Sequence, residues 1–224
     1  MSEVVQLTAK DGHRLDAYVS RPSDPSVAGL VVVQEIYGVN PHIQALADAY
    51  ANDGFLVVAP ALFDRAERKV QLGYGIEDRQ KAIALLRKLK PETALLDIEA
   101  ALAWLRSEGK TAQTGIVGYC FGGTMAWRSA AQLDPQAAVG YYAGGIGDIA
   151  ELTPKCPVML HFGRLDTHIP QSAVEKVHAA HPEVEIFWYD AGHGFNCEER
   201  ESFDAASAEL ARARSLAFLQ KHLG

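Results

Sequence analysis

The sequence predicts an α/β fold in which helices cover both faces of a mostly parallel central sheet. Short apolar runs of strand length alternate along the chain with longer segments that have helical spacing. The runs are almost wholly apolar, which is typical of strands buried on both faces. The chain has 224 residues, 48% of them hydrophobic and 22% charged, so we expect one domain over residues 1–224 with a large core.

An N-terminal hairpin is the first expected element. Strand-like runs over residues 4–8 and 14–20 flank Asp11-Gly12, which is a strong hairpin turn signal. A loop is expected over 21–27. The stretch 62–77 has mixed charge and no clear period, so it is predicted to be a long loop, and such loops in compact domains are often functional.

The rest of the chain alternates between strand-length apolar runs and helical segments. Strands are expected at 29–34, 55–59, 114–117, 137–142, 158–162 and 184–189. Helices are expected at 41–51, 78–89, 92–106, 121–131, 171–180 and 202–223. Because ligands of such sheets bind at the carboxyl ends of the strands, candidate functional residues are sought there.

Charge and cysteine content exclude several classes of protein. The formal net charge of −7 argues against a nucleic-acid binder, whose contact surface would be basic. No apolar run approaches the roughly 18 residues of a membrane span, and no signal peptide is expected from the first residues. The three cysteines form no CxxC pair, which disfavours a disulfide framework or a zinc site. We therefore expect no membrane or nucleic-acid partner, and a reducing, cytoplasmic setting in which a lone cysteine can be reactive.

The segment 118–122, Gly-Tyr-Cys-Phe-Gly, follows an expected strand and opens an expected helix. It matches the nucleophile elbow Gly-x-Ser-x-Gly, with Cys120 in the serine position. Glycines flank the nucleophile because side chains at so sharp a turn would collide with the neighbouring strand and helix. The helix that begins there points its amide groups and the positive end of its dipole at the site. This favours a thiolate on Cys120 and, later in a reaction, an oxyanion. The alternative is a small buried cysteine beside a glycine-rich turn.

A cysteine nucleophile needs a base, and the base needs an orienting acid. In elbow proteins the order along the chain is nucleophile, acid, histidine. Asp166 follows the strand expected at 158–162, and His193 follows the strand expected at 184–189, between two glycines. Each could be an ordinary loop residue, but the order and the three strand ends together predict a triad with Cys120. His168 is too close in sequence to Asp166 to be its obvious partner.

Glu35 comes directly after the buried strand expected at 29–34. A carboxylate at that position is costly unless it is paired or hydrogen-bonded. It is either a solvated loop residue or a carboxylate near the nucleophile. In the second case, by analogy with the usual elbow arrangement, the backbone N–H groups of Ile36 and Phe121 would form the oxyanion hole.

Four segments, VVVQEIYGVN, GYCFGG, GRLDTHIP and AGHGF, together resemble the dienelactone hydrolase family (carboxymethylenebutenolidases) of the α/β-hydrolase superfamily. The resemblance implies the α/β-hydrolase fold and a triad of Cys120, Asp166 and His193. It also implies that Glu35 contacts the resting thiol and helps to activate it. Enzymes of this family hydrolyse an enol-lactone of aromatic ring-cleavage pathways to maleylacetate. In their mechanism the thiolate is acylated and the resulting thioester is then hydrolysed, without a metal or an organic cofactor.

The segment after His193 departs from the family pattern. Family enzymes clamp the substrate carboxylate with arginines, one of them shortly after the histidine, and here Cys197 stands at that position. Arg200 lies a little further on and is not an aligned replacement. The candidates for the other arginine, each of which could equally be a surface charge, are Arg65, Arg68 and Arg79. Candidate substrate-binding residues are Tyr37, Arg79 and Phe195.

The sequence therefore favours a thiol-dependent hydrolase of small esters or lactones that has no cofactor and is a monomer, with a dimer as the alternative. A general small-ester carboxylesterase is the closest competing function. A redox-active thiol protein would need a resolving cysteine, and Cys156 or Cys197 could approach Cys120 only in space. A non-catalytic relic of the fold would have no chemical need for the triad together with Glu35.

Overall fold

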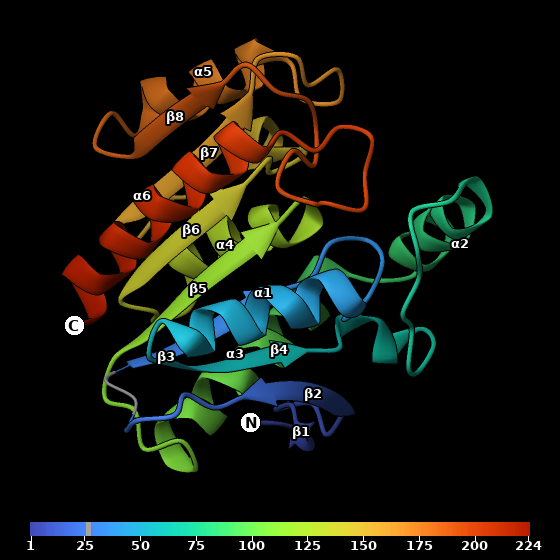
Figure 1. Ribbon diagram of the computed structural model, residues 1–224, viewed down its shortest axis with the longest axis vertical. Coiled ribbons are helices and arrows are strands. Elements are labelled where there is room, and N and C mark those ends of the chain that lie inside the picture. Colours follow the sequence, from blue (N-terminus) through green and yellow to red (C-terminus); the bar gives the residue numbers. More distant parts are fainter. Residues whose placement is uncertain (26–27) are drawn as a thin grey trace.

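The computed structural model describes residues 1–25 and 28–224, so residues 26–27 of the loop expected at 21–27 lie outside the described part. An eight-stranded sheet with strand order β1-β2-β4-β3-β5-β6-β7-β8 forms the centre (Figure 1). β1 pairs antiparallel with β2, and β2 pairs antiparallel with β4. All the other neighbouring pairs are parallel. The prediction of a mostly parallel sheet with an N-terminal hairpin is confirmed.

The elements follow the predicted order, with shifts of a few residues at their ends. The strands are β1 Ser2–Thr8, β2 Arg14–Ser20, β3 Ala28–Val33, β4 Phe55–Pro60, β5 Thr114–Tyr119, β6 Ala137–Tyr141, β7 Val158–Gly163 and β8 Glu185–Tyr189. The helices are α1 Pro41–Asn52, α2 Ile76–Leu86, α3 Pro91–Ser107, α4 Phe121–Gln132, α5 Gln171–Ala180 and α6 Ala205–Leu223, with 3₁₀ turns η1 Leu62–Arg65 and η2 Ile146–Ile149. β5 runs beyond its predicted end, so Cys120 alone separates it from α4.

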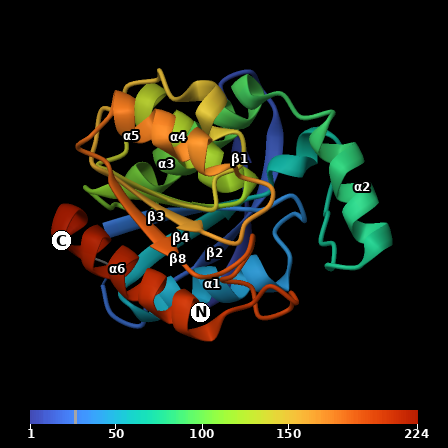
Figure 2. The same cartoon turned by 90° about the horizontal axis from the view of Figure 1, so that it is seen from above.

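Helices cover both faces of the sheet. α1 and α6 lie on one face, and α3, α4 and α5 lie on the other (Figure 2). Every residue of β3, β4 and β5 is buried, which explains why these strands are continuous apolar runs in the sequence. Within the described ranges, none of the helices combines the length and the apolarity that crossing a membrane requires.

The stretch 62–77 is not the featureless loop that was predicted. It contains η1, a short bridge between Gln71 and Gly38, and the first residues of α2. α2 ends at Leu86, before its predicted end, and Lys90, the residue before Pro91, is extended, so a separate helix begins at Pro91. α2 stands apart from the helical layers, beyond the carboxyl ends of the central strands (Figures 1 and 2). This position lets α2 form one wall of the site.

Candidate active site

Cys120 occupies a sharp turn between β5 and α4. Its backbone has φ 54° and ψ −116°, a strained conformation for a residue with a side chain. A Cβ on Gly118 would lie 1.9 Å from the carbonyl oxygen of Gly122, and a Cβ on Gly122 would lie 2.3 Å from that of Val33. Only glycine fits at these two positions, as the elbow interpretation of the motif requires.

In the predicted triad, His193 lies within hydrogen-bond distance of both Cys120 and Asp166. Nε2 of His193 lies 3.2 Å from Sγ of Cys120, and Nδ1 lies 2.7 Å from Oδ2 of Asp166. The other carboxylate oxygen of Asp166 accepts the backbone N–H of His168 at 2.8 Å. The hydroxyl of Ser202 donates to the carbonyl oxygen of His193 at 2.6 Å, which holds the loop that presents the imidazole.

The charges of the triad support one another. Burial alone would lower the pKa of His193, but its hydrogen bonds to Asp166 and Cys120 raise it to about 10. Burial alone would raise the pKa of Asp166, but the hydrogen bond from His193 and its positive charge hold that pKa below the usual value. An imidazolium beside Sγ favours negative charge on the sulfur.

Glu35 is fully buried, so the alternative of a solvated loop residue is wrong. Its Oε2 accepts the hydroxyl of Tyr74 at 3.0 Å, and its Oε1 lies 3.6 Å from Nη1 of Arg200. Burial raises the pKa of Glu35, while the charge of Arg200 and the hydrogen bond from Tyr74 oppose that rise.

The implied contact between Glu35 and the resting thiol does not occur in this structure. Among the described residues, the hydrogen-bond partner of Sγ in Cys120 is Nε2 of His193. Arg200 and Tyr74 hold the carboxylate of Glu35 through charge and a hydrogen bond, and this arrangement leaves the imidazole as the group that faces the sulfur.

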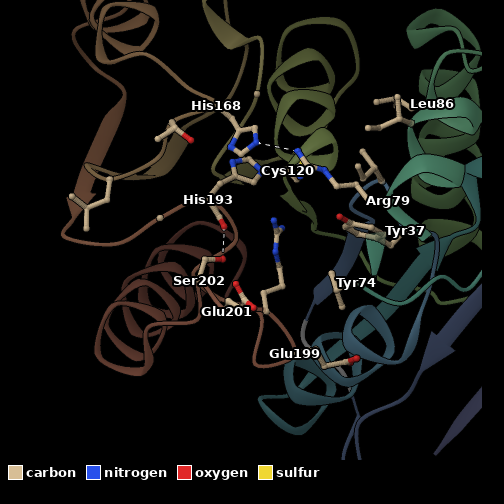
Figure 3. A pocket seen from close by; sticks show the side chains of 18 residues that line it. Tyr37, Tyr74, Arg79, Leu86, Cys120, His168, His193, Glu199, Glu201 and Ser202 are labelled. Carbon is tan, nitrogen blue, oxygen red and sulfur yellow. Dashed lines mark hydrogen bonds between the residues drawn. The ribbon is translucent and has the colours of Figure 1, made fainter. Parts of the chain in front are cut away.

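A cavity of about 900 Å³ opens above Cys120 at the carboxyl ends of the strands (Figure 3). Two of the predicted substrate-binding residues, Tyr37 and Arg79, line it, and so does Ile36, whose N–H is a predicted oxyanion donor. Arg79 reaches across from α2, with Nη2 at 3.4 Å from Nε2 of His168 (Figure 3).

The third predicted substrate-binding residue, Phe195, is a core residue, so that prediction is wrong. Its side chain is completely buried and packs against the rings of Tyr142 and Tyr189, with centroids 5.4 and 5.1 Å away. Cys197 is also buried, in contact with Tyr74, and is not among the lining residues that the structure describes.

The structure separates the three arginine candidates. Arg65 makes a two-pronged ion pair with buried Asp97 and a second pair with Asp11, and Arg68 lies near Asp64. Both are therefore structural charges away from the cavity, and Arg79 is the candidate that lines it.

Sequence reasoning missed Tyr74 and set aside His168 and Arg200, although all three lie in the site. Tyr74 lies in the stretch without a period, and it contacts Glu35 and the ring of Tyr37, 4.6 Å away. His168 places its ring 5.2 Å from that of His193. Arg200 lines the cavity from the segment between β8 and α6, beside the buried carboxylate of Glu35. A search for a cation near the buried carboxylate could have found it, but no local pattern signals Tyr74.

Two groups of side chains in the described part of the chain have metal-ligand chemistry. The ligand atoms of Glu35, His42 and Cys197 lie within 4.8 Å of one another, and those of Asp166, His168 and His193 do the same. The second group is the triad region itself. In the first group Arg200 already supplies positive charge to the carboxylate, so a cation there would be repelled by the guanidinium.

The fold and the elbow define the class of the protein. A mostly parallel eight-stranded sheet with a nucleophile-type elbow after β5 is an α/β-hydrolase fold. The model of the dienelactone hydrolase family matches residues 15–223. The chain belongs to the dienelactone hydrolase family.

Individual relatives agree with this assignment over the whole chain. Carboxymethylenebutenolidase 1 of Cupriavidus pinatubonensis is 31% identical over 98% of this chain and 97% of that protein. Carboxymethylenebutenolidase of Pseudomonas sp. strain P51 is 30% identical over 99% and 96%. A Klebsiella pneumoniae crystal structure, provisionally assigned as a dienelactone hydrolase, superposes with a TM-score of 0.85 at 30% identity and covers 99% of both chains. The expected enzyme class, a carboxylic-ester hydrolase, is confirmed.

Proposed function

We propose that this protein is a cysteine hydrolase of small lactones or esters that carry a carboxylate, and that it acts through an acyl-thioester on Cys120. The observation that carries the proposal is the hydrogen-bond chain from Sγ of Cys120 through the imidazole of His193 to Asp166, at a cavity of about 900 Å³. A structural cysteine would need neither the strained backbone at the turn nor an imidazole aimed at its sulfur.

In the proposed reaction the sulfur of Cys120 attacks the carbonyl carbon. The backbone N–H of Phe121, at the first position of α4, has no acceptor within the helix and can stabilise the oxyanion together with the N–H of Ile36. The C–O bond breaks, and His193 gives its proton to the leaving oxygen. His193 then takes a proton from water, the hydroxide cleaves the thioester, and the acid leaves while the proton returns to the Cys120–His193 pair.

Two arginines support a substrate with a carboxylate. Arg79 is exposed at the cavity wall, and its contact across the cavity is a histidine rather than an acid. Arg200 also lines the cavity, but it shares its charge with buried Glu35. We assign Arg79 as the first anchor of the carboxylate, because a guanidinium without an acidic partner gains most from binding an anion.

The sharing of Arg200 also favours the second candidate, a general small-ester carboxylesterase, because of the two arginines among the described lining residues only Arg79 has no acidic partner. A redox role is disfavoured, since burial raises the pKa of both Cys156 and Cys197 to about 11. Neither thiol is then ready to resolve an oxidised Cys120 near neutral pH. We further propose that the enzyme acts in the cytoplasm as a monomer, a setting that suits three free cysteines.

The test is a hydrolysis panel of dienelactones, simple lactones and neutral aryl esters with wild type, Cys120→Ala and His193→Ala. We expect both variants to lose at least about 10³-fold in kcat/KM, and mass spectrometry of quenched wild-type reactions to find the acyl group on Cys120. Wild-type rates in both variants would refute the triad.

Arg79→Gln should reduce kcat/KM for carboxylate substrates but not for neutral esters. Equal effects on both would favour the general esterase.

A further inference from the structure

α2 turns one row of side chains toward the reactive cysteine. Arg79, Ile83 and Leu86 all line the cavity, and their helical spacing places them on a single face of α2. The adjoining side of the helix, with Ala82 and Leu85, is buried. The cavity wall therefore begins with a positive charge and continues as aliphatic surface, and the whole row from Arg79 to Leu86 spans about 10 Å along the helix axis. Figure 3 shows Arg79 and Leu86 on this wall.

The β7–α5 loop adds one exposed apolar side chain to a lining that is otherwise largely polar there. Leu165, which immediately precedes Asp166 in the β7–α5 loop, lines the cavity and is 67% exposed. Ile36 contributes a further aliphatic side chain beside Cys120. Apolar side chains thus line the cavity from α2, from the β7–α5 loop and from the segment after β3.

The size of the cavity exceeds what a small lactone needs. Cavities of roughly 300–1,000 Å³ hold drug-sized ligands, and this one has about 900 Å³. A lactone with a single carboxylate would contact Arg79 and Cys120 but leave Ile83 and Leu86 in water.

We infer that the face of α2 formed by Ile83 and Leu86, with Leu165 opposite, is a subsite for a hydrocarbon group of the substrate. This inference rests on the proposed function and narrows it. The substrate class is a carboxylate-bearing ester that also carries an alkyl or aryl group. Arg79 binds the carboxylate, Cys120 receives the acyl group, and the hydrocarbon lies along the α2 wall.

Monoalkyl fumarates test the inference, because the carboxylate and the reacting carbonyl stay fixed while only the alkyl group changes. Hydrolysis of methyl, butyl and hexyl hydrogen fumarate is followed by pH-stat titration. We expect wild-type kcat/KM to rise about threefold to fourfold for each added methylene that the wall buries. Ile83→Gln and Leu86→Gln should reduce this rise, measured as the ratio of kcat/KM for the hexyl ester to kcat/KM for the methyl ester. Ile76→Gln is the matched control, because Ile76 is 80% exposed on the same helix and is not among the described lining residues.

The outcomes separate the two proposals. If wild type cleaves methyl hydrogen fumarate through Cys120 but shows no dependence on chain length, the subsite is wrong and the proposed function stands. A dependence that survives in both cavity variants, or that Ile76→Gln abolishes equally, also overturns the subsite. If Cys120→Ala cleaves the esters as fast as wild type, the proposed function itself fails. The methyl ester rate and the thermal midpoint report whether each variant is folded.

Discussion

Burial of the carboxylate of Glu35 at this site lowers the stability of the folded protein. The carboxylate is completely buried, and its Oε1 has no hydrogen-bond partner in the described part of the chain. A buried charge is tolerated only where other groups compensate for its desolvation. Arg200 does so through charge and Tyr74 through one hydrogen bond, but the pKa of Glu35 remains above its usual value. The residue therefore lowers stability whenever it is ionised.

This cost predicts a pH dependence of stability. Between the ordinary pKa of 4.5 and the raised pKa of folded Glu35, the folded protein binds more protons than the unfolded chain. Wild-type stability therefore falls as pH rises through this window, whereas Glu35→Gln lacks the effect. We expect the unfolding free energy of Glu35→Gln minus that of wild type to increase with pH, by at most about 1.4 kcal/mol per unit.

Urea unfolding at a series of pH values measures this difference. Tyr74→Phe is the informative companion, because losing its hydroxyl removes the hydrogen bond to Oε2 and raises the pKa of Glu35 further. The pH range over which stability falls should therefore extend to higher pH in Tyr74→Phe than in wild type. A difference between Glu35→Gln and wild type that stays constant with pH would contradict the assigned desolvation.

At the scale of elements, one side chain fixes both the start of α1 and the loop that presents Tyr74. Asn40 is the N-cap of α1, and its Oδ1 accepts the backbone N–H of Ile43 at 3.2 Å. Its Nδ2 donates to the carbonyl oxygen of Leu72 at 3.0 Å and to the hydroxyl of Tyr74 at 3.2 Å. The helix start and the cavity wall are thus coupled through a single buried amide.

Two substitutions at Asn40 separate these roles. Asn40→Ser keeps a capping oxygen but loses both donors, whereas Asn40→Ala loses the cap as well. We expect Asn40→Ala to be less stable than Asn40→Ser by about 1 kcal/mol in chemical unfolding. Both should lower kcat by the same factor, because both release Tyr74. Equal stability of the two variants would show that the cap contributes nothing, and unchanged kcat would show that Tyr74 is held by other contacts.

The elements that could be predicted from sequence are those with a strong local signal. β3 and β4 are continuous apolar runs, and the elbow combines fixed glycines with a strand and a helix. The triad residues were predicted because the carboxyl ends of parallel strands lie at the same edge of the sheet. Residues that directly follow such strands are therefore close in space even when they are far apart in sequence. Phe195 was misassigned because an aromatic residue beside a loop histidine has the same local pattern in a core as in a pocket. Tyr74 and Arg200 act through contacts across the fold, for which no local pattern exists.

At the scale of the whole molecule, Arg65 joins three parts of the chain that lie far apart in sequence. From η1 it reaches Asp97 on α3 with two hydrogen bonds of 2.7 and 2.8 Å, and Asp11 in the turn between β1 and β2 at 2.8 Å. Asp97 is completely buried, and burial raises its pKa while the charge of Arg65 opposes the rise. This network ties the N-terminal hairpin to the helical layer behind the sheet.

Removing Arg65 should therefore destabilise the whole fold. Arg65→Met leaves the carboxylate of Asp97 buried without a partner, and we expect a loss of about 3–5 kcal/mol in unfolding free energy. Arg68→Met is the matched control with an expected loss below about 1 kcal/mol. Arg68 is 48% exposed, and its partner Asp64 also accepts the backbone N–H groups of Asp16 and Lys69, at 2.9 and 3.2 Å.

The double variant Arg65→Met/Asp97→Asn completes the test, because it removes the buried charge together with its partner. Its stability should recover most of the loss, and urea unfolding of the four members of the cycle measures the coupling. Ester hydrolysis per folded molecule should stay at the wild-type level in every variant, since neither arginine lines the cavity. Equal losses for Arg65→Met and Arg68→Met would mean that the buried pair does not hold the hairpin to α3. If Arg65→Met lost activity while its stability stayed at the wild-type level, Arg65 would be a substrate-binding residue rather than a structural charge.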